Sequence, residues 1–456
     1  EVLEPGSDGR FGGLCPDGHV YNLEVEDTHT YVANGFVVHN CHRAGDVCRD
    51  FLGRQVTYGR LNHLIKALRK ASGPDDKVTS GVVKNAKSVF DLFFQELEQL
   101  RKSAAYDVFF RDPWFTLSSE GVHDALGSMA AAFTAKKSSD NEMRTAVMDR
   151  CVELCRQVDA DLRDLMSLDT EGVVFLEEHG HRMAIREQPI DLGPVLRTWL
   201  FDRYTVIGMS ATLSADGETF GYVLKDLGAP PGTKEFLADP IFTDDQALLV
   251  IPEDIVDPTP QNAVAFQAAV AQIILQVSTL IDGGILCLFT SHRNLQAVLV
   301  ICRTALQAQG RTVLAQGDAP PIRLLEQFKS DIRSVLFGAE TFWEGVDVPG
   351  RSLEAVIIDK LPFQVVDDPV SKAREAKGEK VFFTQSVPRA VLRFKQGFGR
   401  LIRTPSDRGV VFLLDKRVRT KGYGAQFLDS LPPTRLARAG EPWAEKVVRH
   451  MKETKK

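Results

Sequence analysis

The chain has 456 residues, of which 44% are hydrophobic and 25% charged, and its formal net charge is −6. This composition indicates a globular chain with room for about two to four domains, and it excludes nucleic-acid binding through overall charge, so that local basic patches would be needed. The seven cysteines are scattered and odd in number, which argues against a disulfide framework. No apolar run approaches the roughly 20 residues of a membrane span, and we expect a cytoplasmic protein without a membrane partner.

The first part of the chain shows the signature of a β-hairpin. Residues 20–38 contain short runs of alternating apolar and polar residues, interrupted by Asn34-Gly35, a dipeptide typical of a tight hairpin turn. The second strand of this hairpin would end at His39-Asn40. Residues 1–13 are rich in glycine and acidic residues and are predicted to be a loop or linker.

The junction of Asn40 and Cys41 suggests self-cleavage chemistry. An asparagine side chain can attack its own carbonyl and cleave the following peptide bond, and the thiol of Cys41 can accept an acyl group. His39 and His29 could serve as acid and base. The triplet alone is typical of ordinary surface sequence. Together with the preceding hairpin pattern, however, it resembles the C-terminal splicing blocks of inteins, although Asn22 stands where many inteins carry Asp.

Residues 55–189 are predicted to be mainly helical. A short helix should precede them and end near Leu52-Gly53. Helical apolar spacing with charged faces then covers Leu61–Ala71, Val82–Ser103 and Met143–Leu168. Two strands, Gly172–Glu178 and Arg182–Ile190, should be joined through a polar turn. Cys151 and Cys155 could form half of a metal site, but no second pair accompanies them, so we expect core packing.

From Tyr204 onward, short β-rich runs alternate with amphipathic helices, which predicts parallel α/β units. The expected strands are Thr205–Met209, Gly284–Phe289, Arg311–Gln316, Ser334–Gly338, Glu354–Asp359 and Gly409–Asp415. Helices are expected at Gln261–Ile281, His292–Gln309 and Ser386–Arg403. In such sheets, ligand-binding residues lie on loops at the carboxyl ends of strands.

Polar motifs fall at these positions. They are Ser210-Ala211-Thr212, Phe289-Thr290-Ser291, Gln316-Gly317-Asp318, Trp343-Glu344-Gly345-Val346-Asp347 and Gln396-x-x-Gly399-Arg400-x-x-Arg403.

The last motif is the most informative. Its spacing places Gln396, Gly399, Arg400 and Arg403 on one face of a helix that Pro388 can open and Pro405 ends. Gly399 would allow close approach to that face. Two guanidinium groups there suit a triphosphate, because each can donate forked hydrogen bonds to anionic oxygens. A solvated basic helix with surface ion pairs is the plain alternative.

In order and spacing, these motifs resemble motifs III to VI of superfamily 2 helicases of the DinG/XPD type. The runs 334–350, Ile357–Phe363 and Ser430–Pro433 look specifically DinG-like, and Cys41-His42 match the second half of a DECH box. The resemblance covers most of residues 41–433 and is weaker across the helical stretch.

The resemblance implies an α/β fold with RecA-like parallel-sheet motor domains, one partial and one complete. Residues 41–54 and 190–243 would complete the first motor domain, and residues 55–189 would be a helical arch-like insertion. Residues 244–433 would form the second motor domain, followed by a basic tail at 434–456. Residues 1–40 would be an all-β remnant of an intein.

Functional roles follow from the same resemblance. Arg400 and Arg403 would be arginine fingers, while Gln396 and His42 would sense the γ-phosphate of ATP. Thr290 and Ser291 would contact the backbone of single-stranded DNA. The remaining nucleotide-responsive residues would be Gly399, Glu344, Gly345, Asp347, Ser210, Ala211 and Thr212.

Essential parts of an ATPase are missing from this sequence. It contains no G-x-x-x-x-G-K-[ST] phosphate loop, and the Asp-Glu pair expected before Cys41 to hold Mg²⁺ is absent. We therefore expect ATP and Mg²⁺ as cofactors only when an N-terminal helicase half is supplied, and no ATPase activity from the isolated chain. An iron–sulfur cluster could belong only to that half. The expected nucleic-acid partner is single-stranded or forked DNA.

Two alternatives of other classes remain open at the level of sequence. The chain could act only in intein cleavage at Asn40–Cys41, or it could be a non-enzymatic module that binds single strands.

Overall fold

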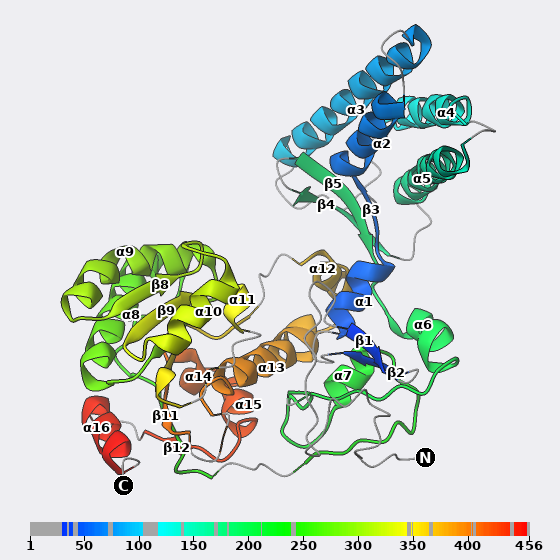
Figure 1. Ribbon diagram of the computed structural model, residues 1–456. Helices are drawn as coiled ribbons and strands as arrows, with labels where there is room; N and C mark the ends of the chain where they lie inside the picture. The colour runs from blue at the N-terminus through cyan, green and yellow to red at the C-terminus, as the bar shows by residue number, and fades with distance from the viewer. Residues whose placement is uncertain are drawn as a thin grey trace, which may run out of the picture. The chain divides into compact units, whose positions relative to one another are not determined.

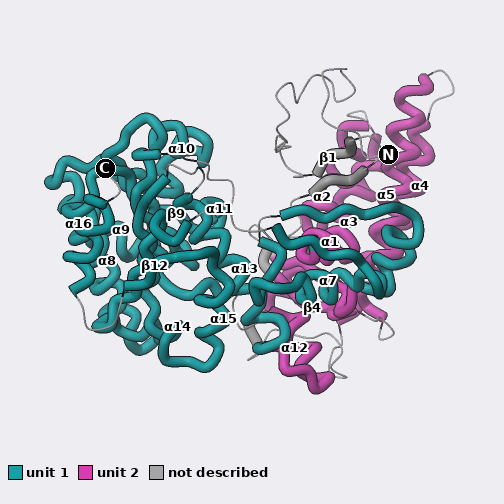
Figure 2. The backbone as a smooth tube through the Cα atoms, turned by 90° about the horizontal axis from the view of Figure 1, so that it is seen from below, with its two compact units in different colours: residues 1–44, 193–364, 382–456 teal, residues 45–192, 365–381 magenta. Residues whose placement is uncertain are grey.

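The computed structural model describes residues 30–33, 36–39, 44–71, 76–103, 117–137, 141–167, 172–179, 182–210, 212–238, 243–343, 348, 350–363, 368–402, 404, 407–437 and 442–453. The chain forms two compact units, which Figure 2 distinguishes by colour. Unit 1 comprises residues 1–44, 193–364 and 382–456, and unit 2 comprises residues 45–192 and 365–381.

Unit 1 is built on a seven-stranded parallel sheet with the order β12-β6-β11-β10-β7-β9-β8. Its short strands are rich in Val, Ile and Leu, as expected for strands buried on both faces. Their bounds are β6 Ala247–Val250, β7 Ile285–Leu288, β8 Thr312–Ala315, β9 Ser334–Gly338, β10 Ala355–Ile358, β11 Gly409–Leu413 and β12 Arg435–Leu436. The expected α/β fold with a parallel sheet is confirmed.

Helices cover both faces of this sheet (Figure 1). One face packs against α8 Ala263–Leu280, α9 His292–Ala308 and α16 Trp443–Glu453. The other packs against α10 Pro321–Ser330, α11 Glu340–Trp343, α13 Val387–Phe398, α14 Arg417–Thr420 and α15 Gly424–Asp429. Alternate residues of each strand enter opposite cores, so that Ile357 faces α8 and α9 while Val356 faces α13.

The expectation that no apolar run approaches the length of a membrane span is wrong at α8. Together with the preceding 3-10 turn Pro260–Asn262, it forms a 21-residue segment that contains an 18-residue window with a mean hydropathy of 1.6, long and apolar enough to span a membrane by length and composition alone. Its residues Phe266, Val270 and Ile274 are buried in the core shared with the sheet. In this fold one face of α8 packs in the core.

The described remainder of unit 1 contains one hairpin and several short helical turns. It includes the antiparallel hairpin of β1 Thr30–Ala33 and β2 Phe36–His39, which confirms part of the predicted hairpin. Residues 193–238 form α6 Gly193–Leu196, a π-helix at Arg197–Phe201 and α7 Gly221–Asp226. The expected strand Thr205–Met209 is wrong: these residues are exposed, Thr205–Gly208 have no regular secondary structure, and Met209 makes only an isolated β-bridge outside the sheets of the described residues.

Unit 2 combines four long helices with a three-stranded antiparallel sheet of order β3-β5-β4. The strands are β3 Arg54–Thr57, β4 Val173–His179 and β5 Arg182–Gln188. The helices are α1 Ala44–Leu52, which leads into the unit, α2 Tyr58–Ala71, α3 Lys77–Ser103, α4 Glu120–Thr134, α5 Glu142–Met166 and the later α12 Pro369–Ala376. The sequence patterns did not predict α4 or β3.

Contacts within unit 2 explain two further features of the sequence. Cys151 and Cys155 are buried on α5, which confirms the prediction that they belong to the core. The segment containing α12 belongs to this unit because the buried Arg374 donates hydrogen bonds to the Ile190 carbonyl, the shorter one 2.7 Å long.

Candidate functional site

The most informative motif lies at the end of α13. The helix carries Pro388 in its first turn, as expected, but it ends at Phe398, so Gly399 and Arg400 lie in a turn. Here the Arg400 amide donates to the Gly397 carbonyl three residues back, and the longer-range helical bonding stops. The prediction that Arg400 shares a helical face with Gln396 is therefore wrong, and Arg403 lies outside the described residues.

Trp343 connects this turn to the sheet. The fully buried indole donates from Nε1 to the Phe289 carbonyl at 2.9 Å, and the Trp343 carbonyl accepts a 3.0 Å hydrogen bond from Arg400 Nε. The Arg393 guanidinium lies 5.2 Å from the centre of the ring. A Cβ atom at Gly397 would lie only 2.8 Å from the indole, so Gly397, and not Gly399, is the glycine that close approach requires.

Two of the predicted motifs meet at Gln396. Its buried side chain donates from Nε2 to Thr212 Oγ1 at 3.3 Å, and the Thr212 amide donates to Ser210 Oγ at 3.2 Å. Next to it, Lys395 Nζ donates to the Ser214 carbonyl at 2.9 Å, and burial lowers the pKa of this lysine. The structure therefore brings Ser210, Thr212 and Gln396 together.

The loop after β7 is held by a buried acid. Asp359, directly after β10, accepts hydrogen bonds from the amides of Thr290 at 3.0 Å and Lys360 at 2.8 Å and from Asn294 Nδ2 at 2.7 Å. Burial raises the pKa of Asp359 to about 6. Ser291 caps α9 by accepting from the Asn294 amide, while Thr290 Oγ1 is buried without a hydrogen-bond partner among the described residues.

A second buried acid follows the neighbouring strand β11. Asp415 accepts a 2.9 Å hydrogen bond from the Leu361 amide and binds Arg417 through Nε and Nη2, the latter at 2.7 Å. Asp359 and Asp415 therefore fix both sides of the Lys360–Leu361 turn. Neither acid was singled out from the sequence, although an aspartate directly after a buried strand is a signal that could have found them.

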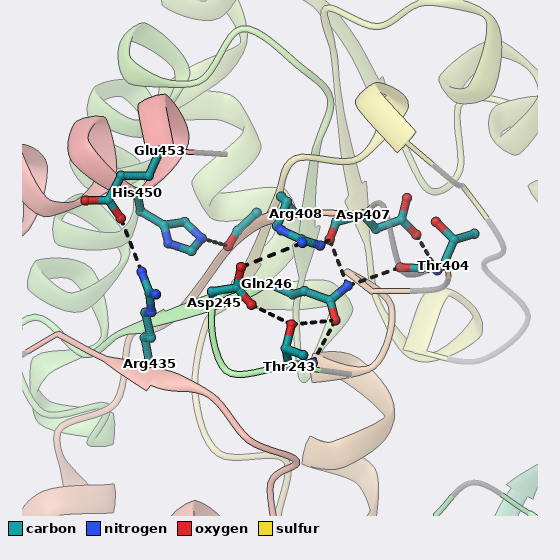
Figure 3. Close-up of polar contacts among 10 residues, drawn as sticks. Thr243, Asp245, Gln246, Thr404, Asp407, Arg408, Arg435, His450 and Glu453 are labelled. Atoms are coloured by element: carbon teal, nitrogen blue, oxygen red, sulfur yellow. Dashed lines mark hydrogen bonds and ion pairs between the residues drawn. The ribbon is translucent and has the colours of Figure 1, made fainter. Parts of the chain in front are cut away.

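At the opposite end of the strands, a polar cluster holds the segment that follows Arg403 (Figure 3). The buried Gln246 side chain donates from Nε2 to the carbonyls of Thr404 and Asp407, both at 3.2 Å. The Asp407 carboxylate in turn accepts from the amides of Thr404 at 2.7 Å and Gly350 at 3.0 Å. The chain on the far side of Arg403 is therefore fixed to the sheet.

Several predicted residues lie outside the described part of the chain. For the splicing and ATPase chemistry these are His29, the side chain of His39, Asn40, Cys41, His42, Ala211, Glu344, Gly345, Asp347 and Arg403. Within the described residues, no group of three His, Cys, Asp or Glu side chains could hold a metal ion.

Comparison with known proteins identifies the class of the sheet-bearing region. Residues 274–434 match the family model of the helicase C-terminal domain. A solved XPD helicase structure aligns with 87% of this chain and 67% of its own, with a TM-score of 0.55 and 16% identity, which reflects a shared fold.

Curated relatives narrow the class. The chain is 35% identical over 281 residues to the 3'-5' exonuclease DinG of Bacillus subtilis, covering 59% of this chain and 30% of that protein. It is 36% identical over 276 residues to the ATP-dependent helicase DinG of Mycobacterium tuberculosis (58% and 41%) and 32% identical over 295 residues to the ATP-dependent DNA helicase YoaA of Haemophilus influenzae (63% and 45%). The chain thus spans less than half the length of these relatives. These matches show that the chain is similar in sequence to a helicase C-terminal domain and to DinG and YoaA proteins, and similar in fold to XPD.

Proposed function

We propose that this chain is the C-terminal half of an ATP-dependent DNA helicase of the DinG type. It would become an ATPase when joined to a front half, defined here as a segment that supplies the phosphate loop and the Asp-Glu pair. In this assignment residues 41–54 and 190–243 belong to the first motor domain, 55–189 to an arch-like insertion, 244–433 to the second motor domain and 434–456 to a basic tail.

The observation that carries this proposal is the hydrogen bond between Gln396 and Thr212. It joins the two motifs that should respond to the nucleotide, although they lie far apart in the sequence. Because Arg400 is anchored through Nε to the Trp343 carbonyl, a change at the nucleotide can reach Phe289 and Thr290 through one buried indole. That route links ATP to the loop proposed to contact DNA.

The donors present in this chain suit only part of a nucleotide site. Arg400, Arg403 and Gln396 offer hydrogen bonds to phosphate oxygens, and arginine fingers stabilise the charge that develops during phosphoryl transfer. Mg²⁺ would neutralise the phosphates when bound, but its ligands must come from the front half, because this sequence lacks the acidic pair. The contribution of this chain is to position positive charge and to couple it to the sheet.

The exposed segment Thr205–Met209 supports the need for a front half. Its apolar side chains include Ile207 and Met209, which are 54% and 56% exposed. Residues of this type favour strands, and neighbouring strands supplied by a front half would bury them.

The test is an ATPase assay with the front half of a DinG relative fused to this chain. The chain alone should show no DNA-stimulated hydrolysis, whereas the fusion should hydrolyse ATP. Arg400→Ala in the fusion should lower turnover by on the order of 10³ while sparing binding to single-stranded DNA. Arg435→Ala is the matched control, because this arginine is paired with Glu453 at the other end of the strands. Turnover by the chain alone, or an Arg400→Ala fusion within a few-fold of the parent, would refute the proposal.

We also propose that residues 1–40 are the C-terminal splicing segment of an intein that interrupts the DECH box. The hairpin of β1 and β2, which ends at His39, and the adjoining Asn40-Cys41 support this assignment. With a matching front intein segment, Asn40→Ala should prevent release of residues 1–40, because alanine has no amide to cyclise. Cys41→Ala should prevent ligation but allow some cleavage. Mass spectrometry that finds ligated product from the Asn40→Ala chain would exclude this role.

A further inference from the structure

Phe382 and Phe383 are presented to solvent by an unusual turn. Residues Phe382–Ser386 form a π-helix, a rare conformation that is frequent at functional sites. The rings of Phe382 and Phe383 are 39% and 59% exposed, while Gln385 in the same turn is buried. The turn therefore directs two large apolar side chains outward and a polar one inward, the reverse of what solvation favours.

These two rings are held in place by other aromatic residues. Phe363 stacks on Phe382 at a centroid distance of 5.6 Å and an interplanar angle of 23°, and Tyr423 meets Phe382 edge-on at 5.5 Å. Phe383 contacts Phe382 edge-on at 5.1 Å and 87°. The fully buried Phe427 packs behind Phe363 and Tyr423. Rings fixed in this way lose little conformational entropy when a further ring stacks on them.

Positive charge lies beside the aromatic rings. The turn leading to Tyr423 contains Lys416, Arg417, Arg419 and Lys421. The first three are ion-paired with Asp257, Asp415 and Glu253 respectively, whereas the exposed Lys421 has no acidic partner among the described residues. Asp415 holds Arg417 with its guanidinium 6.0 Å from the ring centre of Phe363. Aromatic rings beside basic side chains match the chemistry of single-stranded nucleic acid, whose bases stack while its phosphates are negatively charged.

The fold places this cluster at the same end of the sheet as Thr290. Phe363 follows β10 and Tyr423 follows β11, while Thr290 follows β7, and β10 lies between the other two strands. Asp359 connects the loops after β7 and β10, and Asp415 connects those after β10 and β11. The three loops therefore form one continuous row at the carboxyl ends of adjacent strands, where parallel sheets bind their ligands.

We propose that Phe382 and Phe383 are a stacking platform for the bases of single-stranded DNA, supported by Phe363 and Tyr423. This assignment rests on the proposed helicase function, because it adds a base contact to the backbone contacts expected at Thr290 and Ser291. Stacking on an aromatic side chain tolerates any base, as required of a motor that moves along DNA of any sequence.

The test is a thermodynamic cycle between a protein change and a DNA change. Binding of the full chain to fluorescein-labelled oligo(dT) and to an abasic oligonucleotide of equal length is measured by anisotropy at fixed salt. Phe383→Leu should weaken binding to oligo(dT) by roughly 5- to 100-fold, the effect of losing one stacked base. It should change binding to the abasic strand less than about twofold, because no base is present to stack. Phe383→Trp should restore binding to oligo(dT).

Phe236→Leu is the matched control, since Phe236 is 84% exposed elsewhere in unit 1, and it should leave both affinities unchanged. The salt dependence adds a second measurement: Lys421→Gln should reduce its slope by about one, whereas Phe383→Leu should not alter it. Equal weakening on both oligonucleotides, or none on oligo(dT), would overturn the platform while leaving DNA binding intact. If the parent chain binds neither oligonucleotide, the proposed contact with single-stranded DNA is wrong, and the proposed stacking platform is then also wrong.

Discussion

Two regions of unit 1 have similar apolar sequences and very different structures. In the sheet, runs such as Ala355–Ile358 are buried strands that pair on both sides. At Thr205–Met209, a run of comparable character has no strand partner among the described residues, and Tyr204, Ile207 and Met209 remain more than half exposed. A β-rich run becomes a strand only when neighbours complete its hydrogen bonds and cover its side chains. The central sheet therefore folds with partners from this chain, whereas Thr205–Met209 would need strands from another segment to become part of a sheet.

Hydrogen exchange should separate the two regions by the largest margin. In the isolated chain, amides of residues 205–208 should exchange at nearly unprotected rates, because these residues belong to no helix or strand and the described part of the chain offers their amides no backbone hydrogen bond. Amides of β7 and β10 should exchange at least ~10³-fold more slowly, since they open only with much of the sheet. Adding the front half should protect residues 205–208 and leave the exposed residues 234–237 unprotected. Slow exchange at residues 205–208 in the isolated chain would contradict the comparison.

Matched isoleucine substitutions should give the next largest difference. Ile357→Ala in β10 removes a side chain that is 1% exposed and should cost about 2–5 kcal/mol of unfolding free energy. Ile207→Ala should cost less than about 0.5 kcal/mol in the isolated chain, because little buried surface is lost. Denaturant unfolding of both variants checks this expectation. With the front half present, Ile207→Ala should become costly, and equal costs without it would show that residue 207 is already packed.

The two regions should also respond to pH with opposite signs. Burial raises the pKa of Asp359 to about 6 from its usual 3.8, so the folded state binds this proton more tightly than the unfolded state. The contribution of Asp359 to stability is therefore greatest below pH 3.8 and is lost as the pH rises to 6, by on the order of 3 kcal/mol. Although burial raises the pKa of Asp216, hydrogen bonds from Thr219, Glu218 and Ser214 lower it below its usual range, so its contribution is lost as the pH falls.

Unfolding of Asp359→Asn and Asp216→Asn across pH 3 to 7 measures these contributions as differences from the parent. As the pH rises, the free energy of unfolding of the Asp359→Asn variant should increase relative to that of the parent. The free energy of unfolding of the Asp216→Asn variant should decrease relative to that of the parent. If both variants differed from the parent with the same dependence on pH, the prediction of opposite electrostatic contributions would be wrong.

The smallest effects on stability are expected for substitutions in and just after α13, which contacts the sheet through Trp343 and the 193–238 segment through Thr212. On the sheet side, Gly397→Ala would force a Cβ atom against the Trp343 ring and should cost about 1–3 kcal/mol, whereas Gly399→Ala in the exposed turn should cost less. On the other side, Gln396→Ala removes one hydrogen bond to Thr212 and should cost about 1 kcal/mol. Thermal unfolding of the three variants ranks their losses of stability. A larger loss for Gln396→Ala than for Gly397→Ala would contradict the predicted ranking.

Local sequence patterns predicted five of the seven strands of the central sheet, because each of these apolar runs had partners that buried it, but they missed β6 and the two-residue β12. The same reasoning failed at Thr205–Met209, since strand propensity carries no information about whether a neighbour is present. Helical periodicity placed Gln396 correctly but could not fix the end of α13 at Phe398, so the position of Arg400 was wrong.

The contacts of Trp343 could not be predicted at all. They join the segments around Phe289, Gly397 and Arg400, which come together only in the folded sheet. The buried acids Asp359 and Asp415 were visible in the sequence, but their hydrogen-bond partners lie on other loops.

The position of β6 has a consequence for how the protein is made. This first strand of the sheet pairs on one side with β11, through Ala247 and Gly409, and on the other with β12, through Leu248 and Arg435. At a synthesis rate of about 5–20 residues per second, roughly 10–30 s pass before the ribosome delivers the first of these partners. Throughout that interval the nascent chain carries an unpaired apolar strand, which makes β6 a candidate binding site for chaperones during translation.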